Sequence, residues 1–202
     1  MSNDAAQGSP LDPPPFTAET LLLLVTGSIS AALVPYWLNW LRQMYPALVT
    51  HVTVTRSAER FVTVEALRHL VIGEVYRDDW DDANLPKSGH MALEEMAECF
   101  GVFPATVHTA MRLANGHCDS PTLYALQTTT KPIAIAPTFP GTNEVIESRM
   151  EALRTRPNVV VTGTVPAFSV SKQAWTAGTG FFMPLLLEAL ERLRQPDADT
   201  GV

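Results

Sequence analysis

Two short turns that are rich in hydroxyl groups hold the residues best suited to bind an anion. The first turn covers residues 26–30 (TGSIS) and the second covers residues 55–57 (TRS), and each follows an apolar run of strand length. Hydroxyl groups donate hydrogen bonds, glycine allows close approach of the backbone, and a helix start presents free N–H groups, which together favour a phosphate. Neither turn matches the three-glycine dinucleotide motif or the P-loop. Each turn alone is also typical of an ordinary helix cap.

A third candidate site follows a later apolar run. Residues 104–109 (PATVHT) place a proline, small residues and hydroxyl groups at a predicted strand end, which suits the flat edge of a ring system. His108 and His117 are candidate ligands, although a histidine in a helix is more often an ordinary polar residue. His90, considered alone, suits a helix cap or the surface. Cys99 and Cys118 lack metal-ligand spacing, so we predict two structural thiols and no metal site.

An alternating series of strands and helices must position these residues. We predict strands at residues 21–25, 51–55, 99–103, 133–136 and 158–162, and helices at residues 29–44, 91–98, 107–113, 144–154 and 184–193, with a further helix starting at Ser57. Residues 77–89 are polar and acidic, which indicates a long loop. Apolar strands that alternate with helices are typical of an open parallel sheet covered on both faces. Such sheets bind ligands at the carboxyl ends of their strands, where the hydroxyl-rich turns lie.

Length and composition indicate one globular domain between two unstructured ends. The chain has 202 residues, of which 46% are hydrophobic, and this is enough for one full core. We predict the domain at residues 19–194. Residues 1–18 contain four prolines among small and polar residues, which predicts a disordered arm, and residues 195–202 are predicted to be a disordered tail.

The charge balance argues against several classes of partner. Lys and Arg total 14 against 21 Asp and Glu, a net charge of −7, and no basic cluster offers contacts to a nucleic acid or an anionic membrane. Residues 21–41 carry no charge, but polar residues, Gly27 and Pro35 interrupt them, so a strand, a turn and a helix explain them better than a membrane span. Two cysteines are too few for a disulfide scaffold, and we therefore expect a cytoplasmic protein.

Five short motifs, taken in order, resemble those of the homo-oligomeric flavin-containing cysteine decarboxylases. They are TGSIS at 26–30, TRSAERF at 55–61, GHMAL at 89–93, PATVHT at 104–109 and LANGHCD at 113–119. That family includes phosphopantothenoylcysteine decarboxylase and the epidermin-type enzymes, which decarboxylate the C-terminal cysteine of a ribosomally made peptide. The likeness covers about residues 20–190. It implies a flavodoxin-like (Rossmann-like) α/β/α fold, bound FMN, and assembly as a homotrimer or a dodecamer.

The resemblance assigns roles to individual residues. His90 falls where the family has its active-site base, just ahead of a short helix. The residues that match the family's FMN-binding segments are Gly27, Ser28, Ile29, Ser30, Thr55, Arg56, Ser57, Phe61, Pro104, Ala105, Thr106, Val107, His108 and Thr109, and Thr138 is placed beside the flavin.

Two departures from the family pattern concern the substrate. The family carries P-x-M-N-x-x-M-W after the fifth strand, and its Asn holds the substrate carboxylate; here Pro140 stands at that position, Phe139 replaces a Met, and Asn143 is the nearest candidate for the carboxylate. Residues 167–180 match the family's mobile flap but lack the Cys of the small-molecule enzymes, which favours a peptide substrate. Trp175 is a candidate to cover the peptide end, or else an ordinary packing residue.

The resemblance implies a complete reaction. In the family, FMN oxidises the cysteine side chain to a thioaldehyde, which accepts the electron pair as carbon dioxide leaves. We therefore predict FMN-dependent oxidative decarboxylation of the C-terminal cysteine of a precursor peptide, giving an aminoenethiol for aminovinyl-cysteine formation. Two alternatives stay open: a phosphopantothenoylcysteine-type decarboxylase of a small molecule, and an FMN-binding regulatory subunit without catalysis.

Overall fold

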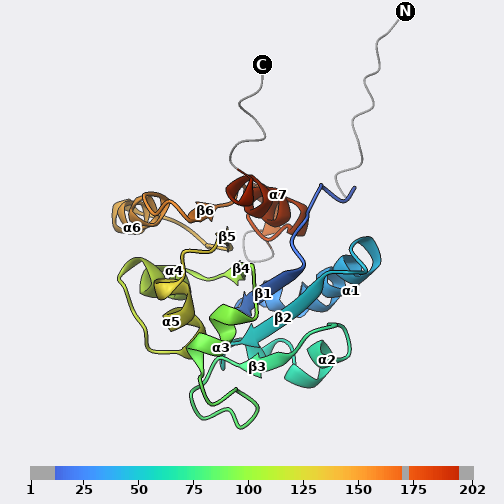
Figure 1. The fold of residues 1–202 in the computed structure, drawn as a ribbon. Coiled ribbons are helices and arrows are strands. Elements are labelled where there is room, and N and C mark those ends of the chain that lie inside the picture. The colour runs from blue at the N-terminus through green and yellow to red at the C-terminus, as the bar shows by residue number, and fades with distance from the viewer. Residues whose placement is uncertain (1–11, 170–172, 196–202) are drawn as a thin grey trace, which may run out of the picture.

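The computed structural model describes residues 12–169 and 173–195 and contains one six-stranded sheet (Figure 1). Every neighbouring pair of strands is parallel, in the order β3-β2-β1-β4-β5-β6. The strands are β1 (Thr20–Val25), β2 (Val49–Val54), β3 (Val75–Arg77), β4 (Cys99–Ala105), β5 (Ile133–Pro137) and β6 (Val159–Val161). The predicted open parallel sheet is confirmed.

Helices cover both faces of this sheet (Figure 1). One face packs against α1 (Val34–Met44), α2 (Val64–Arg68) and α7 (Met183–Arg194). The other face packs against α3 (His90–Glu95), α4 (Val107–Ala114), α5 (Pro121–Thr128) and α6 (Glu144–Arg154). The remaining elements are the 3-10 helices η1 (Ile29–Leu33) and η2 (Ala58–Arg60) and the separate antiparallel hairpin of β7 (Val165–Ser169) and β8 (Ala174–Thr179).

The central strand β1 is buried on both faces. Leu21 and Leu23 pack into the core below α1 and α7, whereas Leu22 and Leu24 pack into the core below α4 and α5. A strand that is covered twice has no solvent face, and its sequence is therefore a continuous apolar run. Among the described residues, none of the helices is long and apolar enough to cross a membrane.

The strand order reverses beside β1. The chain runs from β1 outward to β2 and β3, and then crosses to β4, β5 and β6 on the other side of β1. In such sheets the connections that leave β1 and β4 diverge, and a crevice opens at the carboxyl ends of these two strands. The topology therefore places the first hydroxyl-rich turn and residues 104–109 at the same point.

Two predicted helices are divided in the structure. Residues 29–44 form η1 followed by α1, with Pro35 in the first turn of α1, where its missing N–H costs no helical hydrogen bond. The helix predicted from Ser57 forms η2 and then α2, because Thr63 is extended and its hydroxyl accepts a hydrogen bond from Ala66 N–H to start a new helix.

Other elements were not predicted or differ at their ends. The strand β3, the helix α5 and the β7–β8 hairpin have no counterpart in the sequence prediction, and β4 continues two residues past its predicted end. Residues 12–18 belong to the predicted disordered arm, yet they contact the core: Tyr45 donates its hydroxyl to the Pro14 carbonyl at 2.6 Å, and the Thr17 hydroxyl donates to Glu191 at 2.6 Å. The rest of the arm (1–11) and residues 196–202 lie outside the described residues.

Candidate functional site

The carboxyl edge of the sheet carries a row of threonines. A threonine directly follows five of the six strands: Thr26, Thr55, Thr106, Thr138 and Thr162. Because parallel strands all end at the same edge, this repetition gathers hydroxyl groups along one side of the molecule. Local sequence alone places each of them at the end of an apolar run, and the sheet order decides which of them meet.

Thr26 joins the two strands at the point where the strand order reverses. Its hydroxyl donates to the Pro104 carbonyl at 2.6 Å and accepts from the Thr106 N–H at 3.0 Å. Thr106 in turn caps α4, because its hydroxyl oxygen accepts from the Thr109 N–H. The Thr26 side chain, which belongs to the predicted first turn, thus links this turn to the start of α4.

The two hydroxyl-rich turns are in direct contact. A Cβ atom added at Gly27 would overlap the Cβ of Ser57, so only glycine fits at this position. The Thr55 N–H donates to the Val25 carbonyl at 3.0 Å, which continues the β1–β2 pairing into the second turn. Ser28 accepts from the Ser30 N–H at 3.2 Å and caps η1. The predicted pair of turns therefore forms one continuous surface.

A cavity of about 390 Å³ lies at this edge. Seven of the predicted cofactor-binding residues line it: Gly27, Thr55, Arg56, Ser57, Thr106, His108 and Thr109. The other lining residues were not predicted and are Asp78, Asp79, Trp80, Arg112, Asp119 and Ser120. The remaining predicted residues of these segments are not among the lining residues; Pro104 and Ala105 are buried within β4, and Ile29 and Phe61 are exposed.

The two cations of this cavity differ in their bonding. Arg112 is held by Asp119, and the Arg112 hydrogen bond holds the pKa of that carboxyl below its usual value, although partial burial acts in the opposite direction. Within residues 12–169 and 173–195, the Arg56 guanidinium makes no hydrogen bond or ion pair and is exposed. The cavity therefore offers a free positive charge beside the Gly27–Ser57 contact, which suits a phosphate.

Thr138 and Asn143 have structural partners. The Thr138 N–H and hydroxyl both donate to the Ala105 carbonyl, at 2.9 and 3.1 Å, and this fixes the turn after β5 to the end of β4. Asn143 is exposed, and its side-chain oxygen accepts from the Ile146 N–H at 3.0 Å to cap α6. Phe139 is partly buried against the core. Asn143 thus keeps only its amide nitrogen for another partner.

His90 is the first residue of α3 and does not line the cavity. Its ring lies 3.9 Å from the ring of Tyr124, tilted by 33°, and 6.1 Å from the ring of Trp80. Trp80 itself lines the cavity. His90 is therefore one aromatic ring away from the cavity wall. Neither aromatic partner was singled out from the sequence, in which Trp80 stands in an acidic loop and Tyr124 in a helix that was not predicted.

The β7–β8 hairpin is attached next to Thr138. The Gly180 N–H donates to the Pro137 carbonyl at 2.7 Å, and a Cβ atom at Gly180 would overlap Pro137. On the hairpin, Trp175 is 73% exposed and pairs across the strands with Phe168 at a ring distance of 6.0 Å. The predicted flap is thus a two-stranded arm that carries an exposed aromatic pair; residues 170–172, part of the predicted flap, lie outside the described residues.

The two cysteines differ in burial. Burial raises the pKa of the Cys99 thiol to about 12, so this thiol is not a nucleophile, and Cys118 is exposed. In the part of the chain that the structure describes, no group of three His, Cys, Asp or Glu side chains is placed to hold a metal ion.

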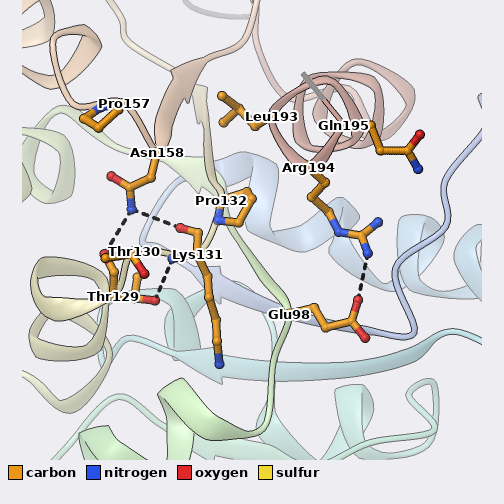
Figure 2. A pocket seen from close by; sticks show the side chains of 10 residues that line it. All are labelled: Glu98, Thr129, Thr130, Lys131, Pro132, Pro157, Asn158, Leu193, Arg194 and Gln195. Carbon is orange, nitrogen blue, oxygen red and sulfur yellow. Dashed lines mark hydrogen bonds and ion pairs between the residues drawn. The ribbon is translucent and has the colours of Figure 1, made fainter. Parts of the chain in front are cut away.

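A larger cavity, of about 590 Å³, lies at the opposite, amino edge of the sheet (Figure 2). Several of its polar side chains already have partners within the protein. Asn158 donates to the carbonyls of Thr129 and Lys131, at 3.0 Å each, and Arg194 pairs with Glu98 at 2.8 Å. None of the residues predicted to bind cofactor or substrate lines this cavity.

Comparison with known proteins relates the chain to flavin enzymes. A family model described as Flavoprotein matches residues 15–179. The chain is 48% identical over 180 residues to the cypemycin cysteine dehydrogenase (decarboxylating) of a Streptomyces species, covering 89% of this chain and 94% of the relative. The crystal structure of the cypemycin decarboxylase superposes with a TM-score of 0.81 at 44% identity, covering 93% of this chain and 100% of that one. An FMN-dependent cysteine decarboxylase from thioviridamide biosynthesis superposes with a TM-score of 0.66 at 26% identity, covering 85% and 98%.

Proposed function

This chain belongs to the flavoprotein family, and on that premise we propose that it is an FMN-dependent decarboxylase of the C-terminal cysteine of a ribosomally made precursor peptide. The product is an aminoenethiol, the precursor of an aminovinyl-cysteine. One observation of the structure carries the proposal: the two hydroxyl-rich turns are in direct contact at Gly27 and Ser57, at the edge of a cavity and beside Arg56, which has no partner among the described residues.

The residues of the carboxyl edge fit the phosphate end of FMN. Gly27 leaves room where a side chain would overlap Ser57, and Arg56 supplies a positive charge with no protein partner among the described residues. Thr55, Ser57 and Thr106 add hydroxyl groups within the same cavity. When bound, FMN supplies a two-electron oxidation of the cysteine side chain, which allows carbon dioxide to leave, and dioxygen takes up the two electrons afterwards.

His90 is proposed as the base that accepts a proton from the substrate. A positioned base contributes typically ~10²- to 10⁴-fold to a rate. The ring of His90 contacts the ring of Trp80, which lines the cavity, and it also contacts the ring of Tyr124. The two aromatic rings flank the imidazole, which has no hydrogen-bonding partner among the described residues.

The hairpin and the turn after β5 are proposed to bind the peptide. Both meet at Pro137, where the hairpin is hydrogen-bonded to the end of β5. Trp175 is exposed on the hairpin and covers the peptide end when the arm closes, with Gly178 and Gly180 as the hinge. Asn143 donates its remaining amide hydrogens to the substrate carboxylate, and Phe139 lies in the same turn.

A homo-oligomer, either a trimer or a dodecamer built from trimers, is part of this proposal. An apolar stripe supports it: Ile29, Leu33 and Tyr36 are 73%, 58% and 53% exposed along η1 and α1. Their spacing puts them on one side of the helical segment, directly after the first hydroxyl-rich turn. Light scattering coupled to size exclusion tests the assembly, and a monomer would contradict it. The cytoplasmic location stays a prediction from the sequence.

Two measurements on the purified protein test the function. An absorbance spectrum detects bound flavin, and mass spectrometry follows a panel of hexapeptides that end in cysteine and vary at the two preceding positions. Flavin bands together with loss of the mass of carbon dioxide and two hydrogen atoms are expected. Turnover of phosphopantothenoylcysteine in place of the peptides would favour the small-molecule alternative. Flavin bands without turnover of any thiol would favour the non-catalytic subunit. A protein without flavin would contradict the proposed function and both alternatives.

A further inference from the structure

The ring of His90 is held by aromatic contacts. In the part of the chain that the structure describes, the imidazole makes no hydrogen bond and no ion pair. Its ring neighbours are Tyr124 at 3.9 Å, nearly face to face at 33°, and Trp80 at 6.1 Å and 76°. The rings of Trp80 and Tyr124 also contact each other edge to face, at 6.4 Å and 85°. The three rings come from the loop after β3, from α3 and from α5.

We propose that Tyr124 is a positioning residue for the reaction, because its ring fixes the orientation of the His90 imidazole. This inference rests on the proposed role of His90 as the base. A base must lie within hydrogen-bond reach of the proton that it takes, and a free histidine side chain samples several rotamers. A ring that lies 3.9 Å from the imidazole, tilted by 33°, removes rotamers that would need this space. Tyr124 thus does for His90 what a hydrogen-bonding carboxylate does for the histidine in many other enzymes.

The fold holds Tyr124 and Trp80 in a fixed relation. The Asp78 carboxylate accepts from the Thr122 N–H at 2.9 Å, which joins the loop after β3 to the first turn of α5. Ser120 caps the same turn by accepting from the Leu123 N–H. Trp80 lies two residues after Asp78 and Tyr124 two residues after Thr122, so this hydrogen bond keeps the two segments that carry the rings close together.

Gly89, the residue before His90, allows Trp80 to pack closely against the backbone. Gly89 is buried and has a φ of +52°, and a Cβ atom at this position would lie 3.2 Å from the ring of Trp80. The Trp80 ring therefore packs directly against the backbone that leads into α3. Since Trp80 also lines the cavity, the chain of contacts runs from the cavity wall through Trp80 to His90 and Tyr124.

The Tyr124 hydroxyl takes no part in this arrangement. It makes no hydrogen bond with any of the described residues. The ring alone carries the proposed role, so phenylalanine should replace tyrosine without loss. Leucine is apolar but smaller and offers no flat face, and it leaves the imidazole free to turn.

A double-mutant cycle on the FMN-loaded protein, with the cysteine-ending hexapeptides as substrates, tests the proposal. Tyr124→Leu should lower kcat/KM by about 10- to 100-fold, the scale expected when a catalytic group is misplaced. Tyr124→Phe, the matched control, should keep the wild-type value. The double variant Tyr124→Leu/His90→Asn should be no slower than His90→Asn alone, because a group that acts through another adds nothing once the other is gone.

A second readout does not depend on turnover. In protein with isotope-labelled histidine, the ring protons of His90 should carry an upfield shift from the Tyr124 ring current, and the His90→Asn variant identifies the signal. Tyr124→Leu should remove this shift and Tyr124→Phe should keep it, whereas the signals of His108 and His117 stay in place.

The outcomes separate this inference from the proposed function. Independent, multiplying losses in the double variant, an unchanged His90 signal in Tyr124→Leu, or loss of bound flavin in that variant would each overturn the positioning role. A His90→Asn variant with full turnover would instead remove the base assignment, while the flavin bands and the mass change would still support the decarboxylase.

Discussion

The two edges of the sheet are built from the same strands but differ in how their polar side chains are bonded. At the amino edge, the larger cavity of about 590 Å³ is lined by Asn158, Lys131 and Arg194, each of which bonds to a carbonyl or a carboxylate of the protein (Figure 2). At the carboxyl edge, the cavity of about 390 Å³ contains Arg56, which has no partner among the described residues.

This difference indicates that the unused bonding capacity of the lining residues, and not the volume of the cavity, is the better criterion for a binding site in this protein. A polar group that bonds within the fold contributes to stability and has little bonding capacity left for a ligand. A cation without a partner, beside a glycine that leaves the backbone open, can still form strong bonds to an anion. We therefore propose the smaller cavity as the site, whereas the Arg194–Glu98 ion pair beside the larger cavity links α7 to the start of β4. Substitutions at the two edges should have separable effects.

The largest expected effect comes from closing the contact between the two turns. Gly27→Val should abolish FMN binding, because its side chain overlaps Ser57 and displaces the second turn. The variant should purify without flavin bands and should not take up added FMN in a fluorescence titration. Gly163→Val is the matched control, since no atom lies within 4 Å of a Cβ atom at Gly163, and it should keep its flavin. Normal FMN affinity in Gly27→Val would move the cofactor away from this contact.

The proposed base should affect rate without affecting the cofactor. His90→Asn should lower turnover of the hexapeptides by ~10²- to 10⁴-fold, the usual contribution of a general base. Because His90 lies behind Trp80 and outside the cavity lining, the absorbance of bound flavin should be unchanged. Loss of flavin in this variant would assign His90 a structural role.

Replacing one arginine by methionine at each edge tests directly whether the two edges differ in FMN binding. Arg56→Met should weaken FMN binding by about 10- to 100-fold, since a hydrogen bond to a charged group contributes ~1.5–3 kcal/mol. Arg194→Met should leave the FMN dissociation constant unchanged and lower the free energy of unfolding, because Glu98 and Glu191 lose their ion pair with this arginine. Fluorescence titration and urea denaturation measure the two quantities. Equal FMN affinities in the two variants would contradict the difference between the edges.

A neutral change at the amino edge should affect stability alone. Asn158→Ala removes two hydrogen bonds and leaves the carbonyls of Thr129 and Lys131 without this donor, which should cost about 1–3 kcal/mol of unfolding free energy. Peptide turnover at 25 °C should stay at the wild-type level. A strong loss of turnover without loss of stability would indicate that this cavity takes part in function.

The smallest expected effect is a pH dependence of stability at the amino edge. Burial would raise the pKa of Glu191, but hydrogen bonds from Thr17 and the charge of Arg194 outweigh it and hold the pKa below its usual value. A carboxyl whose pKa is depressed on folding adds stability above its unfolded pKa and loses it as pH falls through the folded pKa. Thermal unfolding of Glu191→Gln should therefore vary less between about pH 5 and pH 3 than that of the wild type. Identical slopes would contradict this contribution.

Local sequence signals account for the frame of the fold and for seven of the thirteen residues that line the cavity at the carboxyl edge. The uncharged run through Leu21–Val25 predicts a strand covered on both faces, and the structure confirms it. The resemblance assigned both hydroxyl-rich turns to FMN binding, and in the structure Gly27 and Ser57 are in contact. The residues that complete the cavity were missed, because Asp78 and Trp80 stand in an acidic loop whose sequence resembles any exposed loop.

The missed elements have physical explanations. The helix α5 is buried on more than one side, at Thr122, Leu123, Ala125 and Leu126, so its sequence lacks the two-sided pattern that predicts a surface helix. The edge strand β3 has three residues, too few for a periodic signal. The hairpin pairs only with itself, so no buried core imposes an apolar alternation on it.

The sequence by itself determined the parallel sheet, the turns that follow its strands and the residue types at those turns, because these depend on neighbours along the chain. The tertiary structure alone decided which polar groups were left without a partner. The side-chain oxygen of Asn143 caps α6 and is not free to contact a substrate. Arg194 bonds to Glu98, whereas Arg56 bonds to no described residue. Hydrogen bonds between residues distant in sequence form only when the sheet order brings them together, and for that reason the free cation at the carboxyl edge is a property of the fold.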